Sequence, residues 1–223
     1  MAKIMVINPN TSSDLTKHIK KVLQSVRTNA TSFEVVQLDE GPEAVESSKD
    51  VDYVAPKVAA MVAKNEKNFD AFVIACFADP GLESARELSG VPVVGIMEAS
   101  MLVSCALGEK FSILAINSRR APTKWRYARS IGLHERMASV IPLNLPVAKM
   151  EGDSDELRSA IKKAAHRAKE DGAEVLILGC AALAGRAHEV EREAGLPVVD
   201  PLLVGFKLAE SLATIKLSHY RRE

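Results

Sequence analysis

The sequence predicts an α/β fold built from two similar halves, and two observations support this prediction. Short β-branched runs alternate along the 223 residues with longer segments of helical period, a pattern typical of βαβ units around parallel strands. Related segments also recur at a nearly constant separation, which indicates that the same unit is present twice. Hydrophobic residues make up 47% of the chain, enough for one large core or two modest ones.

The first half contains four expected strands and four expected helices. The strands are short apolar runs that end at polar or turn-forming residues: Lys3–Ile7, Phe33–Leu38, Ala71–Ala75 and Val91–Ile96. The helices have apolar residues every three or four positions: Asp14–Ser25, Val51–Asn65, Gly81–Leu88 and Glu98–Leu107. Asp79 and Pro80 are typical of a helix N-cap and first helical residue, and Gly90 of a helix end, so we expect them to bound the third helix.

The second half repeats this alternation by the same criteria. Its expected strands are Phe111–Ile116, Ala138–Leu143, Val175–Leu178 and Leu196–Val199. Its expected helices are Arg119–Ile131, Ser154–Glu170, Ala182–Ala194 and Leu203–Ser218. We expect the two halves to be pseudosymmetric Rossmann-like (flavodoxin-like) domains, each with a four-stranded, mainly parallel sheet.

Three matched segments define the repeat. "FVIAC" before Cys76 matches "VLILGC" before Cys180, 104 residues later. "VPVVGI" at Val91 matches "LPVVDP" at Leu196, and "KIMVIN" matches "SILAIN". The separations are similar and the order is the same, so we place the first domain at residues 1–97 plus 203–223 and the second at 98–202. These bounds assign the last helix of each half to the other domain. Because open parallel sheets bind ligands beyond the carboxyl ends of their strands, we expect the active site in a cleft between the domains.

The composition narrows the range of partners. The 29 basic and 29 acidic residues balance, so neither nucleic acid nor an anionic membrane is expected to bind. The apolar runs are far shorter than the roughly 20 residues of a membrane span, and residues 1–5 lack the features of a signal peptide, so we expect a cytoplasmic protein. The three cysteines and five histidines have no metal-ligand spacing, and most of the histidines are expected at the surface. We expect a small-molecule substrate, no metal, and assembly into a homo-oligomer.

Cys76 and Cys180 are the candidate catalytic residues because they occupy equivalent points of the repeat. Each lies between a strand and an expected helix, and a helix amino terminus can lower a thiol pKa from about 8.5 to roughly 3.5–7.5. A single cysteine in such a place is more often a small buried hydrophobe, but two equivalent cysteines favour a function. Cys105 has the spacing of a core position in its helix, so we expect it to be structural.

Two opposed thiols suit one particular reaction. One thiolate can remove an acidic proton from a carbon next to a carbonyl, and the other thiol can return a proton to the opposite face. The product is the mirror-image centre. Hydrogen-bond donors must stabilise the enolate between the two steps, and we expect the strand-end loops to supply them.

Four segments carry a family resemblance. "INPNTS", "ACFADPGL", "VPVVGIMEAS" and "ILGCAALAG" resemble, in this order and over most of the chain, the hydantoin racemases of the aspartate/glutamate racemase superfamily. The resemblance implies two pseudosymmetric α/β domains, no cofactor, and racemisation of 5-substituted hydantoins or allantoin by two cysteines. It also implies that Cys76 and Cys180 form the proton-transfer pair, and that Asn8, Asn10 and Thr11 lie at the substrate.

The second half departs from the family pattern. Hydantoin racemases usually have two adjacent threonines after the strand that opens this half, where the chain has Ala115 and Ile116. Asn117 and Ser118 follow them and are candidates to replace the missing donors. The remaining candidate substrate-binding residues directly follow the two cysteines and are Phe77 and Ala181.

Several alternatives stay open from the sequence. An aspartate or glutamate racemase, or a maleate cis-trans isomerase, would use the same cysteines within the superfamily. A flavin- or phosphate-binding protein would use the hydroxyl-rich loop at Thr11, although no GxGxxG or GxxxxGK motif is present and only 4% of residues are aromatic. A non-catalytic protein that binds a small molecule is a further alternative. Glu98 either interacts with the dipole of its own helix or faces the cleft.

Overall fold

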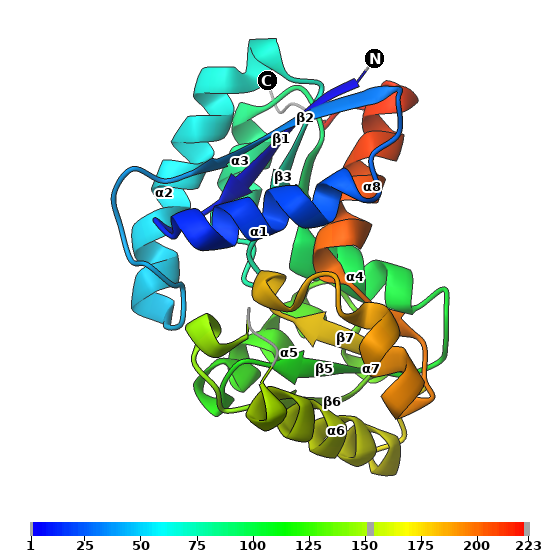
Figure 1. Ribbon diagram of the computed structural model, residues 1–223. Coiled ribbons are helices and arrows are strands. Elements are labelled where there is room, and N and C mark those ends of the chain that lie inside the picture. The colour runs from blue at the N-terminus through cyan, green and yellow to red at the C-terminus, as the bar shows by residue number, and fades with distance from the viewer. Residues whose placement is uncertain (1, 151–153, 221–223) are drawn as a thin grey trace. The chain divides into compact units, whose positions relative to one another are not determined.

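A computed structural model describes residues 2–150 and 154–220 of the chain (Figure 1). The chain divides into two compact units, Met1–Ala99 with Leu202–Glu223, and Ser100–Pro201. Each unit contains one four-stranded parallel sheet with helices packed on it. This arrangement confirms the predicted α/β fold with two sheets of the same kind.

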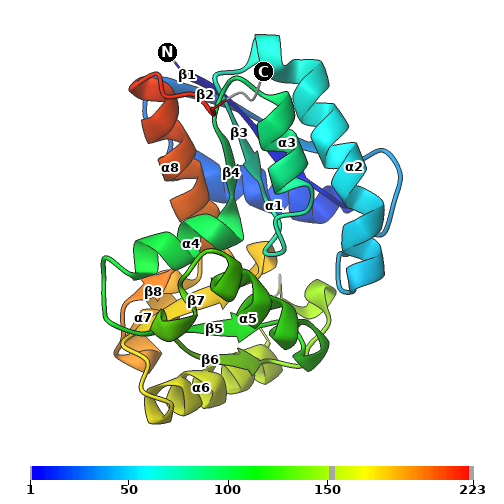
Figure 2. The same ribbon diagram turned by 180° about the vertical axis from the view of Figure 1, so that it is seen from behind.

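The first unit has the strand order β2-β1-β3-β4. Its strands are β1 (Ala2–Asn8), β2 (Thr31–Gln37), β3 (Ala71–Ile74) and β4 (Val93–Gly95). Its helical segments are α1 (Ser13–Gln24), α2 (Ser48–Asn65), the 3-10 turn η1 (Glu66–Asn68), α3 (Leu82–Leu88) and most of α8 (Pro201–Thr214), and α4 (Ile96–Ser104) begins after β4. The crossovers before and after β2 run in opposite directions across the sheet. Right-handed connections therefore place α1 on one face and α2 and α3 on the other (Figures 1 and 2).

Both faces of the first sheet are buried. On the face under α2 and α3, the apolar side chains of alternate strand residues pack against the helices, and the cluster is formed by Met5, Ile7, Phe72, Ile74, Val93, Val58, Val62, Leu82 and Ala85. On the opposite face, the ring of Phe33 meets Phe206 of α8 edge to face, with centroids 5.5 Å apart. Burial on both sides explains why the inner strands are continuous apolar runs in the sequence.

The second unit repeats this topology with the strand order β6-β5-β7-β8. Its strands are β5 (Phe111–Ala115), β6 (Met137–Pro142), β7 (Val175–Gly179) and β8 (Val198–Val199). Its helices are α5 (Ala121–Ser130), α6 (Asp155–Glu170) and α7 (Ala187–Ala194), with the 3-10 turns η2 (Ser118–Arg120), η3 (His134–Arg136), η4 (Val147–Lys149) and η5 (Ala181–Leu183). Seen from its two sides, this sheet has α6 and α7 on one face and α5 on the other (Figures 1 and 2).

The cap predicted for one helix was wrong, and a second predicted helix is divided in two. The N-cap of α3 is Gly81, in a left-handed conformation with φ 73°, and neither Asp79 nor Pro80 belongs to the helix. The helix itself agrees with the expected Gly81–Leu88 to within one residue, and Gly90 directly follows its C-cap, Ser89. In the second unit, the helix expected from Ala182 is divided into the turn η5 and the helix α7, because the chain turns through Gly185 at φ 86°.

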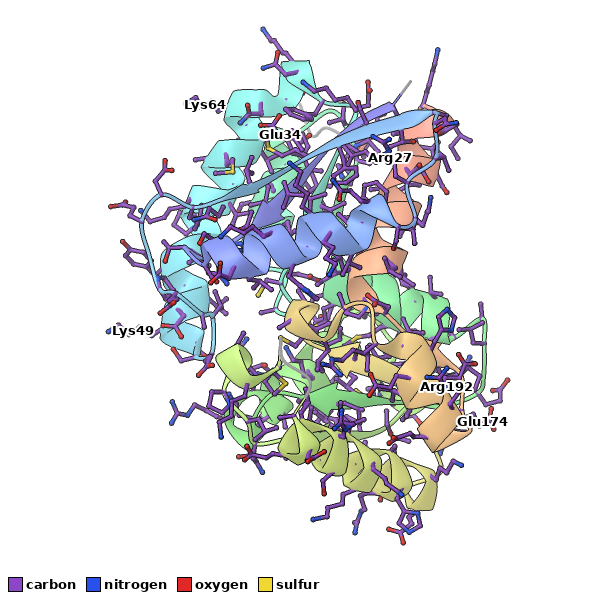
Figure 3. All side chains as sticks on the ribbon, in the orientation of Figure 1. Arg27, Glu34, Lys49, Lys64, Glu174 and Arg192 are labelled. Atoms are coloured by element: carbon purple, nitrogen blue, oxygen red, sulfur yellow. The ribbon has the colours of Figure 1, made fainter. Side chains whose placement is uncertain are left out.

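Charged side chains lie mainly on the outer faces of the helices. Figure 3 shows Lys49 and Lys64 on α2 and Arg192 on α7 pointing away from the ribbon. No helix within residues 2–150 and 154–220 combines the length and the apolar character that a membrane crossing requires.

Side chains cover the backbone of the edge strand β4. The Val93 amide donates to Nε2 of His219 at 2.7 Å, and Nε of Arg86 donates to the Val93 carbonyl at 3.2 Å. Arg86 also binds Glu98 through two hydrogen bonds of 2.6 and 3.1 Å, so the role found for Glu98 is an ion pair. An uncovered edge strand would present these backbone groups to other chains. His219 is therefore half-buried and structural, unlike most of the predicted surface histidines.

We expect His219 to make stability depend on pH. Burial and the nearby Arg86 lower the pKa of His219 below its ordinary value, and Glu98 opposes the shift. The neutral ring is the form that accepts from Val93. The contribution of this hydrogen bond to the free energy of unfolding is complete above about pH 6.5. It is lost as the pH falls through the lower pKa that His219 has in the folded state.

Urea unfolding of the wild type and of His219→Gln between pH 8 and pH 5 measures this effect. The glutamine keeps an acceptor but does not titrate, so the difference in unfolding free energy between the two proteins should change with pH in this range. A constant difference would contradict the assignment.

Candidate active site

The inner strands of the first unit bring Asn8 and Cys76 to one edge of the sheet. β1 and β3 are parallel neighbours, with Ile7 paired to Ile74. The amide of Ala75 donates to the Ile7 carbonyl at 2.8 Å, so the pairing continues to the residue before Cys76. Asn8 is the last residue of β1. Asn8 and Cys76, both predicted from the sequence as site residues, therefore lie at the carboxyl ends of adjacent strands.

The side chain of Asn8 is fully buried and held in one orientation. Its Nδ2 donates to the Ser12 carbonyl at 3.3 Å and to Oγ1 of Thr16 at 3.0 Å, and the Thr16 hydroxyl donates to the same carbonyl at 2.8 Å. Because the Thr16 proton is engaged, its oxygen can only accept from the amide. Oδ1 of Asn8 therefore points elsewhere, and it is buried with no hydrogen-bond partner among the described residues. Such an acceptor costs about 1–3 kcal/mol unless a donor reaches it.

Asn10 and Thr11 shape the loop after β1. Oδ1 of Asn10 accepts from the Ser12 amide at 3.0 Å, and the Asn10 carbonyl accepts from Leu38 at 3.1 Å. The Thr11 amide and hydroxyl both donate to the Pro42 carbonyl, at 3.2 and 3.4 Å. Ser12 caps α1 by accepting from the Leu15 amide. These bonds fix the loop around Asn8 and occupy part of the hydrogen-bonding capacity of Asn10 and Thr11.

The loop that carries Cys76, residues 75–81, is a tight turn and not the start of a helix. The Asp79 amide donates to the Cys76 carbonyl at 3.0 Å, and Asp79 itself has a positive φ of 45°. A Cβ on Gly81 would lie 2.3 Å from the Ala55 carbonyl oxygen, so only glycine fits against α2. Phe77 is buried. Cys76 therefore does not lie at the amino terminus of the helix expected to follow it, because α3 begins only at Leu82.

The carboxylate of Asp79 caps a different helix from the one predicted. Its Oδ1 accepts from the Met97 amide at 3.0 Å, and its Oδ2 accepts from the Glu98 amide at 2.9 Å. Both amides belong to the first turn of α4, where backbone N–H groups lack intrahelical partners. Hydrogen bonds to a charged group contribute roughly 1.5–3 kcal/mol each. The carboxylate is buried, and it binds the Met97 amide, 18 residues along the chain, where the sequence predicted that it would cap the helix that directly follows it.

The second unit places Cys180 in the equivalent position. β5 and β7 are parallel neighbours, with Ala115 paired to Gly179, and Cys180 directly follows β7. A Cβ on Gly179 would lie 2.4 Å from the Leu114 carbonyl oxygen, so glycine permits the close approach of the two strands. Cys180 is the N-cap of the short turn η5, so an isolated 3-10 turn follows it where a long helix was expected.

The turn after Cys180 contains two buried residues whose backbone donors are not used within it. The amides of Leu183 and Ala184 donate to the carbonyls of Cys180 and Ala181, each at 3.1 Å. The amides of Ala181 and Ala182 make no hydrogen bond within the part of the chain that the structure describes. Ala181 was predicted as a substrate-binding residue. Ala182 was missed because its donor is a backbone amide, which almost every residue type has. Two such amides beside a thiol can donate to a developing oxyanion.

Asn117 and Ser118 differ from their counterparts in the first unit. Oδ1 of Asn117 accepts from the Arg120 amide at 3.1 Å and caps η2, so this oxygen is already engaged, in contrast to Oδ1 of Asn8. Ser118 is exposed, and its amide donates to Oδ1 of Asn144 at 3.3 Å. The repeat partners Asn8 and Asn117 are thus matched in position but not in hydrogen bonding.

The three cysteines carry thiols and form no disulfide in residues 2–150 and 154–220. Cys105 lies just after α4, and its thiol donates to the Met101 carbonyl at 3.3 Å. Burial raises the pKa of Cys105, which keeps the thiol protonated, and Arg136 opposes the shift. These contacts agree with a structural residue. Across the same described residues, no cluster of His, Cys, Asp or Glu could hold a metal ion.

Comparison with known proteins places the chain in a family. The model of the Asp/Glu/Hydantoin racemase family matches residues 4–209, which include both cysteine loops. The chain belongs to the Asp/Glu/Hydantoin racemase family. A hydantoin racemase from Paenarthrobacter aurescens is 37% identical over 96% of this chain and 92% of its own length. As a member of this family, the protein is an isomerase of the racemase type.

Two solved structures are also similar to the chain. An allantoin racemase from Klebsiella pneumoniae is 33% identical, with a TM-score of 0.93 over 99% of this chain and 91% of that chain. An allantoin racemase from Pseudomonas fluorescens is 31% identical, with a TM-score of 0.92 over 98% and 93% of the two chains. The family resemblance carried by the four sequence segments is thereby confirmed.

The close approach at Gly179 gives a test of the strand packing next to Cys180. In Gly179→Ala the new Cβ meets the backbone of β5, so the two inner strands must separate, and we expect a loss of at least about 2–3 kcal/mol of unfolding free energy. Gly132→Ala is the control, because Gly132 has φ 74° and nothing within 4 Å of the new Cβ. The control should lose only the roughly 1–2 kcal/mol of a left-handed residue. Equal losses in urea unfolding would contradict the steric explanation.

Proposed function

We propose that this protein racemises a 5-substituted hydantoin or allantoin without a cofactor, and that Cys76 and Cys180 transfer the protons. The observation that carries the proposal is the identity of more than 30%, over nearly the whole length, to a hydantoin racemase and to allantoin racemases. The positions of the cysteines support it, since each follows the inner strand next to the first strand of its unit. Both cysteines are partly accessible.

The proposed reaction exchanges one proton at the chiral carbon of the ring. The thiolate of one cysteine removes the proton from this carbon, and the electron pair of the broken C–H bond moves into the adjacent carbonyl to form an enolate. The thiol of the other cysteine then donates its proton to the opposite face, and the carbonyl forms again. The two sulfurs have exchanged protonation states, so the enzyme is ready for the reverse direction.

Two groups described above suit the substrate proposed here. Hydantoin and allantoin carry ring N–H groups, and the buried Oδ1 of Asn8 is an acceptor without a donor in the described residues. Maleate has no N–H group, so this acceptor favours the cyclic ureides over maleate. The amides of Ala181 and Ala182 are proposed to donate to the enolate oxygen formed when Cys180 acts. Asn10, Thr11, Phe77, Asn117 and Ser118 are proposed to shape the substrate-binding loops.

We expect Cys76→Ser and Cys180→Ser each to reduce racemisation by at least about 100-fold, since proton transfer by a positioned side chain contributes roughly 10²–10⁴-fold. In deuterated water, each variant should still exchange the hydrogen of one enantiomer, and the two variants should act on opposite enantiomers. Chiral chromatography and mass spectrometry of 5-substituted hydantoins, allantoin, aspartate, glutamate and maleate measure this directly.

Cys105→Ser is the control for these variants, because Cys105 lies outside the proposed site and serine can also donate to the Met101 carbonyl. It should retain the activity of the wild type. Full racemisation by both Cys76→Ser and Cys180→Ser would rule out the two-thiol mechanism, and turnover of maleate or an amino acid alone would rule out the proposed substrate class.

Asn8→Ala tests the proposed contact with the ring N–H. A lost hydrogen bond of about 1.4 kcal/mol corresponds to a tenfold change, so we expect KM for a hydantoin to rise roughly tenfold or more. Thr16→Ser is the matched control, since serine keeps the hydroxyl that holds the Asn8 amide and therefore leaves Oδ1 in place. Its KM should stay within about threefold of the wild type. An unchanged KM in Asn8→Ala would remove Asn8 from the binding site.

A further inference from the structure

A buried carboxylate ties the cysteine loop to the end of the fourth strand in both units. In the first unit, Asp79 lies in the loop of residues 75–81 and accepts from the Met97 and Glu98 amides beyond β4. In the second unit, Asp200 lies beyond β8, and its Oδ2 accepts from the Gly185 amide in the loop of residues 180–186 at 2.6 Å. Both aspartates are buried. We call this arrangement the carboxylate clasp.

The two aspartates of the clasps do not occupy equivalent positions of the repeat. The strand segments that end at Gly95 and Asp200 are equivalent, so the second unit has its carboxylate where the first has glycine. A Cβ on Gly95 would lie 2.3 Å from the carboxyl carbon of Asp79, which means that the Asp79 carboxylate fills the space of a side chain at residue 95. In the second unit, Leu183 stands where the first cysteine loop has Asp79. In the first unit the carboxylate belongs to the cysteine loop, and in the second it belongs to the end of the fourth strand. In both units it joins the cysteine loop to the end of the fourth strand.

Each clasp restrains a cysteine through few bonds. In the first loop, the Asp79 amide donates to the Cys76 carbonyl at 3.0 Å, so the anchored residue is also bonded to the cysteine. In the second loop, the Leu183 amide donates to the Cys180 carbonyl at 3.1 Å, and the Arg186 amide, beside the anchored Gly185, donates to the Leu183 carbonyl at 3.3 Å. A charged hydrogen bond at each loop therefore limits the movement of the backbone that carries the thiol.

We propose that Asp79 and Asp200 are positioning residues for Cys76 and Cys180, respectively. The proposal rests on the proposed function, because it assumes that both thiols must meet the reacting carbon. Proton transfer requires the sulfur to lie close to the carbon, and a displacement of about 1 Å can reduce the rate roughly 100-fold. Asp79 and Asp200 thus position equivalent cysteines, although the two aspartates are not equivalent residues of the repeat.

The test compares Asp79→Asn and Asp200→Ala with Asp52→Asn, a matched control on the exposed face of α2. Asp79→Asn directs an NH₂ group at a backbone N–H, and Asp200→Ala removes the acceptor of Gly185. Iodoacetamide labelling of the whole protein, followed by mass spectrometry of each cysteine peptide, measures the two loops separately. We expect the labelling ratio of Cys76 to Cys180 to rise at least about fivefold in Asp79→Asn and to fall by a similar factor in Asp200→Ala. The control should keep the ratio of the wild type.

Racemase kinetics supply the second readout. After correction for the folded fraction by circular dichroism, kcat should fall roughly 10- to 100-fold in both variants, while KM stays within about threefold. Gly95→Ala, which displaces the Asp79 carboxylate, replaces Asp79→Asn if that variant does not fold. Asp200→Asn, which keeps one oxygen as an acceptor, replaces Asp200→Ala with a smaller expected effect.

The outcomes separate the two proposals. A labelling ratio equal to that of the wild type in both variants, or equal changes at both cysteines, would overturn the positioning role. Labelling does not depend on turnover, so the clasp is tested even if the wild type racemises no hydantoin. That result would overturn the proposed function alone.

Discussion

The ladder between the two inner strands of each sheet is the constraint on which the rest of each unit depends. β1 and β3 pair through Ile7 and Ile74, and β5 and β7 pair through Ala115 and Gly179. These strands are buried on both faces, so their register cannot slip without exposing the core. Because both ladders are parallel, the residues that follow the strands emerge at one edge. The cysteines and the asparagines occupy that edge as a result of the pairing.

The strands and their repetition could be predicted from the sequence because a strand that is buried on both faces consists almost entirely of apolar residues. "AFVI" and "VLILG" are continuous apolar runs, and turn-forming residues end them. Cys76 and Cys180 follow these two runs, so their equivalence was visible without coordinates. The family then followed from the same segments, and the comparisons bear it out.

The loops were less predictable because tertiary contacts decide their conformation. Asp79 has the residue type and position of a local N-cap, but its carboxylate binds α4, and Gly81 caps α3 where Ala55 leaves no room for a side chain. The spare acceptor of Asn8 depends on Thr16, eight residues away, whose hydroxyl fixes the amide. The donors at Ala181 and Ala182 are backbone groups. None of these features follows from residue type alone.

The exchanged aspartates also constrain how the two halves could have diverged from a common ancestor. A chain with aspartate at both equivalent positions would place a side chain at residue 95 within 2.3 Å of the Asp79 carboxyl carbon. A stepwise history between the two forms therefore cannot pass through the doubly acidic state without displacing one carboxylate. The alternative intermediate has no carboxylate, and its cysteine loop would be held by weaker neutral contacts. The two positions exclude each other sterically in the first unit, so the halves of this molecule are similar in fold yet not interchangeable residue by residue.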